Sequence, residues 1–219
     1  MSEEKYNNNM ATIYDLIHED KDYKSEVDYI EHIYRSIDSD KKEVLDVGCG
    51  TGRHLEVFKE YGYKVNGVDP SGHMIEEAKN NVVNHITGED EELEEFFKSI
   101  SRRMNKKGIL VFDCFNRAAY VKDAPHKIVK NLKSGASLVV EPKTDYYEST
   151  LDLMCEYKDD SGSFNYEINH KIWHINTIIV ALLKSGLSPR NIYKHFECKE
   201  ATSEDYKVVF VCKKVKAIR

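Results

Sequence analysis

The chain has 219 residues, with 38 acidic and 32 basic side chains and a net charge of −6. This length suits one domain with a small appended element, and the negative charge gives no general attraction to nucleic acid. No apolar run reaches the roughly 18 residues of a membrane helix, and residues 1–5 lack a signal-peptide pattern. Five cysteines without a C-x-x-C pair are typical of buried thiols. We therefore expect a cytoplasmic protein with neither nucleic-acid nor membrane partners.

The first predicted element is an amphipathic helix over residues 24–37, where apolar residues recur at helical spacing from Val27 to Ile37. A short apolar run over residues 44–47 then predicts a buried parallel strand. Glycines follow at every second position from Gly48 to Gly52. A turn this rich in glycine brings the backbone close to a ligand and lets the next helix point its amide groups at it.

A helix over residues 55–61 and a strand over residues 64–68 complete a β-α-β unit that ends at Asp69. A carboxylate at the end of this second strand can accept hydrogen bonds from both hydroxyls of a ribose. The dinucleotide fingerprint requires a glycine where this chain has Arg53, so the pyrophosphate pattern is not met. The ligand we expect is a nucleoside without a pyrophosphate.

Asp46-Val47-Gly48-Cys49-Gly50-Thr51-Gly52, followed by Val68-Asp69-Pro70-Ser71, resembles the class I S-adenosylmethionine-dependent methyltransferases. The resemblance implies a Rossmann-like, mostly parallel α/β sheet and S-adenosylmethionine as the cofactor. In that family the glycine turn holds the methionine part, and the acid after the second strand holds the ribose. The cofactor residues implied here are Asp46, Gly48, Cys49, Gly50, Gly52 and Asp69. An α/β domain whose glycines merely make a tight turn is the alternative.

Two tyrosines precede the glycine turn in a segment that resembles the amino-terminal lid of small-molecule methyltransferases, including those that N-methylate amino sugars. The resemblance implies that Tyr14 lies near the point of methyl transfer and that Tyr23 contacts the cofactor. The alternative is ordinary partial burial, since the chain has 14 tyrosines.

After Asp69 we expect a helix over residues 71–81 and a third strand over residues 84–87. The resemblance then places an acid beside the adenine, and we assign Glu89, with Asp90 as the alternative. Acids at these positions also suit the positive end of the helix that follows.

The chain departs from the family pattern at the fourth strand. Residues 91–104 already form an amphipathic helix, because the apolar positions from Leu93 to Ile100 have period 3.6. The fourth-strand segment that normally precedes this helix is missing. Loss of this strand also removes one wall of the cofactor crevice. Either the first and fifth strands then pair directly, or the gap is bridged in another way.

The fifth strand is predicted over residues 108–115 and a loop over residues 116–125. Between residues 127 and 174 several alternating segments predict an inserted antiparallel cap. A helix over residues 176–186 and an antiparallel pair over residues 191–197 and 206–213 close the fold. We thus expect an S-adenosylmethionine-binding domain of residues 1–126 and 175–219 with a lid, and a substrate cap of residues 127–174.

Glu167 and His170 resemble an acid–histidine pair of that cap, in which His170 could remove a proton from the methyl acceptor. The alternative is a polar cross-strand pair on a solvated face. His174 is a weaker candidate. No metal site is predicted, because the histidines lack a second pair of ligands at usable spacing.

The predicted function is methyl transfer from S-adenosylmethionine to nitrogen or oxygen of a small polar metabolite, with a sugar as one candidate and a homodimer as one candidate assembly. A non-catalytic S-adenosylmethionine-binding protein that has lost part of its pocket is the alternative. A nicotinamide-dependent oxidoreductase is disfavoured by the glycine spacing.

Overall fold

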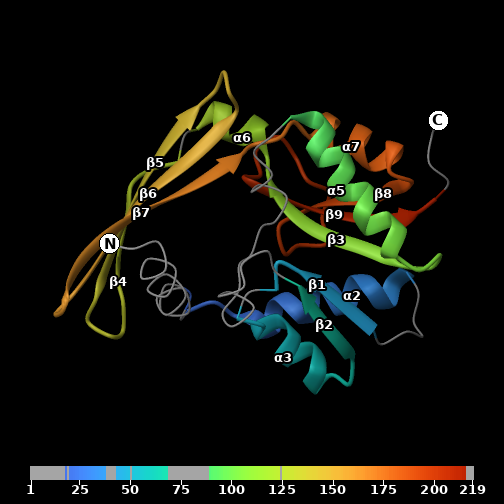
Figure 1. Ribbon diagram of the computed structural model, residues 1–219, viewed down its shortest axis with the longest axis horizontal. Helices are drawn as coiled ribbons and strands as arrows, with labels where there is room; N and C mark the ends of the chain where they lie inside the picture. The colour runs from blue at the N-terminus through green and yellow to red at the C-terminus, as the bar shows by residue number, and fades with distance from the viewer. Residues whose placement is uncertain are drawn as a thin grey trace. The chain divides into compact units, whose positions relative to one another are not determined.

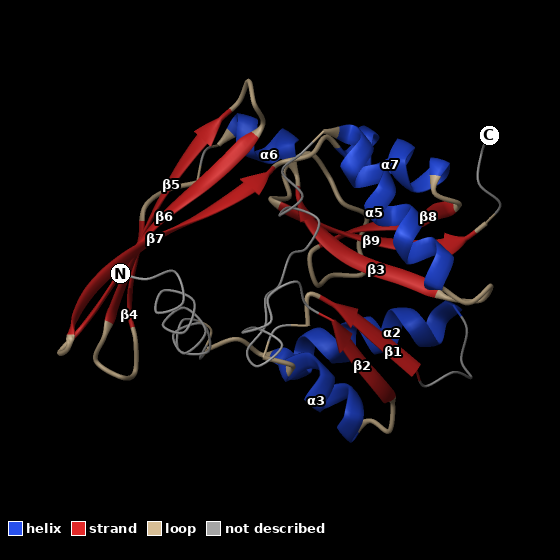
Figure 2. Ribbon diagram, in the orientation of Figure 1, coloured by secondary structure: helices blue, strands red, loops and turns tan. Residues whose placement is uncertain are grey.

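Figure 1 shows a computed structural model of the chain, which describes residues 18, 20–37, 43–49, 51–68, 89–123 and 125–215. The chain divides into two compact units. The first comprises residues 1–82, 129–138 and 157–163, and the second comprises residues 83–128, 139–156 and 164–219. Helices and strands are distinguished by colour in Figure 2.

The first unit contains the predicted β-α-β arrangement. Its described elements are α2 (Tyr23–Ile37), β1 (Glu43–Val47), α3 (Arg53–Glu60) and β2 (Lys64–Val68). The two strands are parallel, with Glu43 opposite Lys64 and Val47 opposite Val68. Buried Val27, Phe58 and Tyr63 pack together as the core of this unit. The helix and strand predictions for this part of the chain are therefore confirmed.

The second unit is built around a three-stranded antiparallel sheet. This sheet consists of β3 (Ile109–Phe115), β8 (Leu187–Lys194) and β9 (Lys207–Lys214). The helices of this unit are α5 (Asp90–Arg103), α6 (Arg117–Lys122) and α7 (Ile175–Lys184). The strand order is β3-β9-β8, and both pairings are antiparallel. Leu93 and Phe97 of α5, Leu182 of α7 and Phe210 of β9 are fully buried in one core cluster. The predicted fifth strand, the helix predicted over residues 176–186 and the closing antiparallel pair are confirmed, although β8 begins four residues and ends three residues before the predicted range of 191–197.

Residues 116–120, which we expected in a loop, include the start of helix α6. Asn116 caps this helix, because its side-chain oxygen accepts a hydrogen bond from the N–H of Ala118 at 3.2 Å. The loop prediction was wrong for these residues. A helix of six residues is too short for a periodic apolar pattern, and here the asparagine cap stabilises its start.

Four strands occupy the range where we expected the cap. They are β4 (Ile128–Asn131), β5 (Ser137–Asp145), β6 (Thr150–Asp159) and β7 (Gly162–Lys171), and they lie in chain order in one sheet. The turn between β6 and β7 is stabilised by Asp159, whose carboxylate accepts hydrogen bonds from the N–H and the hydroxyl of Ser161 at 2.8 and 2.6 Å.

The described strands fall into three sheets, and β1 and β2 form a parallel pair. Helix α5 begins at Asp90, one residue before the predicted start, and no described residue forms a strand where the family has its fourth. The helix and the strand predicted over residues 71–87 lie outside the described residues. Among the helices that the structure describes, none combines the length and the apolar character needed to cross a membrane.

Candidate functional site

The glycine turn between β1 and α3 is closed by backbone hydrogen bonds. The N–H of Gly48 donates to the carbonyl oxygen of Val68 at 2.7 Å, and the N–H of Gly52 donates to that of Cys49 at 3.0 Å. Gly48 and Gly52 have φ angles of 80° and 76°, a region that side chains disfavour. A Cβ at Gly52 would meet no heavy atom within 4 Å, so the backbone there is open to a ligand. This geometry fits a turn that closes on a nucleoside cofactor.

Cys49 is a packing residue of the turn. It is buried and contacts Leu55 of α3, and a Cβ at Gly67 of β2 would lie only 2.6 Å from its Sγ atom. The absence of a side chain at Gly67 therefore lets the turn fold down onto β2. Asp46, opposite Gly67 in the strand register, is half-buried.

Tyr23, the predicted lid residue, begins α2 and lies beside the first turn of α3. Its ring packs edge-on against the imidazole of His54, with centroids 5.0 Å apart. The Nε2 atom of His54 lies 2.6 Å from a carboxylate oxygen of Glu26, and Lys21 reaches the same oxygen at 3.2 Å. Burial alone would raise the pKa of Glu26, but the hydrogen bond from His54 and the charge of Lys21 hold that pKa below its ordinary value.

Three predicted site residues, Tyr14, Gly50 and Asp69, lie outside the described residues, and their roles stay predictions. Glu89 is exposed and occupies the position before α5, and Asp90 is the first residue of that helix. Both acids therefore lie where the positive end of the helix favours negative charge. Their role toward adenine is not tested by this placement.

A partly buried ionic cluster lies near the carboxyl end of β3. Asp113 accepts a hydrogen bond from Nζ of Lys207 at 2.9 Å, and Nε2 of His195 lies 3.3 Å from the same oxygen. Burial would raise the pKa of Asp113, but the positive charge of Lys207 and the hydrogen bond from His195 hold it well below its usual range. The ammonium of Lys207 also lies 5.4 Å from the ring centroid of Phe115. Asp113 is therefore ionised, and it orients a histidine at the end of a strand.

His170 is buried in β7 and contacts Phe115. Its ring packs edge-on to that of Phe115 at 5.2 Å, and its Nδ1 atom lies 3.3 Å from the carbonyl oxygen of Leu151. If Nδ1 carries the proton that this carbonyl accepts, Nε2 is the basic nitrogen. The imidazole therefore has one fixed orientation.

The expected pairing of Glu167 with His170 was wrong. Residues three apart in a strand point to opposite faces, and here His170 is buried while Glu167 is exposed. Glu167 instead accepts a hydrogen bond from the amide of Asn169 at 3.0 Å. The same amide donates to the carboxylate of Asp152 in β6 at 3.0 Å, so a polar cross-strand contact forms on the solvated face, as in the alternative, without His170.

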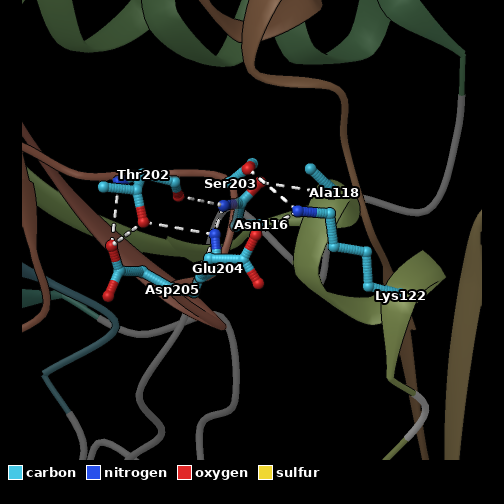
Figure 3. A network of polar contacts seen from close by, with 7 residues as sticks. All are labelled: Asn116, Ala118, Lys122, Thr202, Ser203, Glu204 and Asp205. Carbon is cyan, nitrogen blue, oxygen red and sulfur yellow. Dashed lines mark hydrogen bonds and ion pairs between the residues drawn. The ribbon is translucent and has the colours of Figure 1, made fainter.

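Asn116 connects the end of β3 to the segment that precedes β9 (Figure 3). Its side-chain amide donates to the carbonyl oxygens of Thr202 and Asp205 at 3.0 and 2.9 Å, while its oxygen caps α6. Lys122 of α6 donates to the hydroxyl of Ser203 at 3.2 Å and contacts Glu204. Asn116 itself is only 1% exposed, so its amide depends on these protein partners for its hydrogen bonds.

Arg117 holds the connection between β5 and β6. Its guanidinium donates to the hydroxyl of Ser149 at 2.9 Å and to the carbonyl oxygen of Tyr146 at 2.8 Å. Ser149 has a φ of 55°, a conformation that non-glycine residues rarely adopt. Arg117 therefore has protein oxygens as hydrogen-bond partners.

Within residues 18–215, apart from the gaps given above, no group of three histidine, cysteine or acidic side chains is arranged to hold a metal ion. His174 is exposed at the start of α7. Burial raises the pKa of Cys114, and it raises that of Cys212 to about 12. Both thiols therefore stay protonated at neutral pH and serve as packing groups.

The sequence did not predict the ion pairs beside the glycine turn and at the end of β3. Glu26 and His54 are 28 residues apart, and Asp113 and Lys207 are 94 apart, so no local pattern joins either pair. Only the cap of α6 had a local signal, the asparagine directly after an apolar strand.

Comparison with known proteins agrees with this geometry. A family described as "Methyltransferase domain" matches residues 17–141. A sugar dimethyltransferase of Streptomyces venezuelae, which acts on dTDP-3-amino-3,4,6-trideoxy-alpha-D-glucopyranose, is 31% identical over 141 residues, covering 60% of this chain and 56% of the relative. A ubiquinone biosynthesis O-methyltransferase of Coxiella burnetii is 28% identical over 126 residues, covering 56% and 49%. The chain thus spans about half the length of these curated relatives.

The fold is also found in solved structures. An S-adenosylmethionine-dependent methyltransferase from Clostridium acetobutylicum has a TM-score of 0.75 at 18% identity, with 95% of this chain and 99% of that chain covered. The fold is therefore Rossmann-like, of the methyltransferase type.

The turn geometry and these similarities define a protein of the nucleoside-binding α/β class. The chain belongs to the class I methyltransferase-domain family, and S-adenosylmethionine is the cofactor that this family assigns to it.

Proposed function

We propose that this protein transfers a methyl group from S-adenosylmethionine to nitrogen or oxygen of a small polar metabolite. The observation that carries the proposal is the turn from Gly48 to Gly52, whose positive φ angles and open backbone lie at the position where the family holds its cofactor. The proposal includes a mostly parallel sheet, with an S-adenosylmethionine-binding domain of residues 1–126 and 175–219 and a substrate cap of residues 127–174. It also includes a homodimer and a cytoplasmic location.

Each predicted site residue has a role in this proposal. The turn residues hold the methionine part, Asp69 the ribose, Glu89 the adenine, and Tyr23 contacts the cofactor from the lid. Tyr14 and His170 act at the point of methyl transfer. The full set is Tyr14, Tyr23, Asp46, Gly48, Cys49, Gly50, Gly52, Asp69, Glu89 and His170.

The chemistry requires alignment more than activation. The lone pair of the acceptor forms a bond to the methyl carbon as the bond from that carbon to sulfur breaks, and S-adenosylhomocysteine leaves. The acceptor loses a proton, which Nε2 of His170 could take while Nδ1 donates to Leu151. A neutral amine can react before its proton is removed, whereas a hydroxyl gains more from a base.

An amino sugar linked to a nucleotide is the acceptor that we favour. The support is the 31% identity to the Streptomyces venezuelae enzyme, whose name gives such a sugar. The relative from Coxiella burnetii keeps an oxygen acceptor open. An S-adenosylmethionine-binding protein without transferase activity is the second candidate, because no described residue forms the fourth strand. A nicotinamide-dependent oxidoreductase is less favoured, since Arg53 occupies the position of the third fingerprint glycine.

Titration calorimetry followed by an activity assay tests the proposal. We expect S-adenosylmethionine and S-adenosylhomocysteine to bind and NAD not to bind. With S-adenosylmethionine and dTDP-3-amino-3,4,6-trideoxy-alpha-D-glucopyranose, mass spectrometry should detect S-adenosylhomocysteine and a sugar heavier by one or two methyl groups. Binding without transfer to this sugar or to a hydroxylated analogue favours the second candidate. Absence of binding to either adenosyl ligand overturns the proposal.

The carboxylate of Asp69 offers a sharper test of the cofactor site. Asp69→Ala should weaken S-adenosylmethionine binding by about 1.5–3 kcal/mol, the worth of hydrogen bonds to a charged group. An unchanged affinity would show that Asp69 does not hold the ribose.

A further inference from the structure

Four side chains of the first unit form one cluster at the amino-terminal ends of α2 and α3. Lys21, Tyr23 and Glu26 belong to α2 or the residues just before it, and His54 is the second residue of α3. We call these four residues the clip. His54 follows Gly52 of the glycine turn by only two positions.

The carboxylate of Glu26 is the centre of the clip. One oxygen accepts from Nε2 of His54 at 2.6 Å and from Nζ of Lys21 at 3.2 Å, which brings both nitrogens to the same atom. The side chains of Glu26 and His54 are each 14% exposed, so water screens these contacts far less than it screens a surface ion pair. Charge-assisted hydrogen bonds of this length are strong and geometrically specific.

The clip also fixes an aromatic ring. The ring of Tyr23 meets the imidazole of His54 edge-on at 5.0 Å, and the ammonium of Lys21 lies 5.0 Å from the centroid of the same ring. Glu26 thus holds His54 and Lys21, the two side chains that contact the ring of Tyr23. Removing that one carboxylate takes away an anchor of both.

We infer that Glu26 and His54 are positioning residues of the cofactor site. They hold the ring of Tyr23 and the ammonium of Lys21 beside the start of α3, where an aromatic face and a positive charge suit the sulfonium-bearing, carboxylate-ended methionine chain of S-adenosylmethionine. The inference rests on the cofactor of the proposed function and is independent of the methyl acceptor.

A second link between the same two helices provides a matched control. The hydroxyl of Tyr61, which follows α3, donates to the carboxylate of Asp28 of α2. Along the axis of α3 this link lies about 10 Å from His54, at the end away from the glycine turn. A variant that breaks it weakens the contact between the helices without touching the clip.

The experiment compares Glu26→Ala, Glu26→Gln, His54→Ala and Tyr61→Phe. Calorimetry measures the Kd for S-adenosylmethionine, and thermal unfolding without ligand measures the Tm. We expect Glu26→Ala and His54→Ala to raise the Kd about tenfold or more, as for the loss of one charge-assisted contact. Glu26→Gln keeps an oxygen acceptor for His54 and should recover most of the affinity. Tyr61→Phe should lower the Tm but leave the Kd within about twofold of the wild type.

Two results would overturn the inference while leaving the proposed function intact. One is wild-type affinity in Glu26→Ala. The other is a loss of affinity that follows the loss of Tm equally in Glu26→Ala and Tyr61→Phe, since that pattern describes general stability. A wild-type protein that binds neither S-adenosylmethionine nor S-adenosylhomocysteine overturns the inference and the proposed function together.

Discussion

Gly67 of β2 lies directly against Cys49 of the glycine turn. A Cβ at Gly67 would come within 2.6 Å of the Sγ atom of Cys49 and within 2.7 Å of Cδ1 of Leu55. Real side chains do not approach so closely, so the turn and β2 can lie together only because position 67 has no side chain. The turn therefore depends on a glycine that stands outside its own motif.

This contact predicts the effect of Gly67→Ala. The added methyl group must displace Cys49 and Leu55, and such overpacking costs about 1–3 kcal/mol. Urea unfolding measures the loss. The neighbouring exposed residue provides the control, because Asn66→Ala should change the free energy of unfolding by no more than about 0.5 kcal/mol. Equal effects of the two substitutions would contradict the steric explanation.

Asp113 predicts a pH-dependent contribution to stability. Its pKa is lowered in the folded protein, so this stabilisation is fully present above the unfolded-state pKa of about 3.9 and is lost as pH falls through the lower folded pKa. Asp113→Asn should therefore be less stable than the wild type at pH 7, with the difference shrinking below about pH 4. Urea unfolding between pH 7 and pH 3 measures both curves. A difference that does not change with pH would refute the role of the charge.

Asn116 predicts a large effect from a single amide. Asn116→Ala removes a side chain that is almost fully buried and takes the donor away from the carbonyl oxygens of Thr202 and Asp205, at a cost of about 1–3 kcal/mol. Lys122→Met removes the neighbouring contacts to Ser203 and Glu204, but that side chain is half exposed and should matter by no more than about 1 kcal/mol. Chemical unfolding of both variants tests this order, and a greater loss in Lys122→Met would reverse it.

His170 predicts a separation between catalysis and cofactor binding. If Nε2 takes the proton of the acceptor, His170→Asn should lower kcat about 100-fold, the usual contribution of a general base, and leave the Kd for S-adenosylmethionine unchanged. Glu167→Gln, on the exposed face of the same strand, should leave kcat unchanged. A kcat that survives in His170→Asn would indicate an acceptor that needs no base.

Local patterns sufficed for most of the described elements. Helical spacing from Val27 to Ile37 predicted α2, and the apolar run before Asp113 predicted β3, because burial of one face imposes the period on the sequence. Helix α6 was missed because it has six residues, too few for a periodic pattern.

The candidate site was less predictable than the fold. The glycine turn has a local motif, whereas the carboxylates that orient histidines were not identified, because Glu26 and Asp113 find their partners only after distant segments pack. Glu167 and His170 show the opposite error, since a sequence spacing suggested a pair that the alternation of a strand separates.

The position of β9 constrains how the second unit can be made. This strand, residues 207–214, lies between β3 and β8, and its residues 208–212 are all buried. Among the described strands, the neighbour of β3 in this sheet is β9, which is synthesised almost a hundred residues later. We therefore expect the backbone groups of β3 that pair with β9 to stay unpaired until residue 214 has been added. A nascent chain halted before residue 207 should be a client of chaperones, whereas β1 and β2 can already pair.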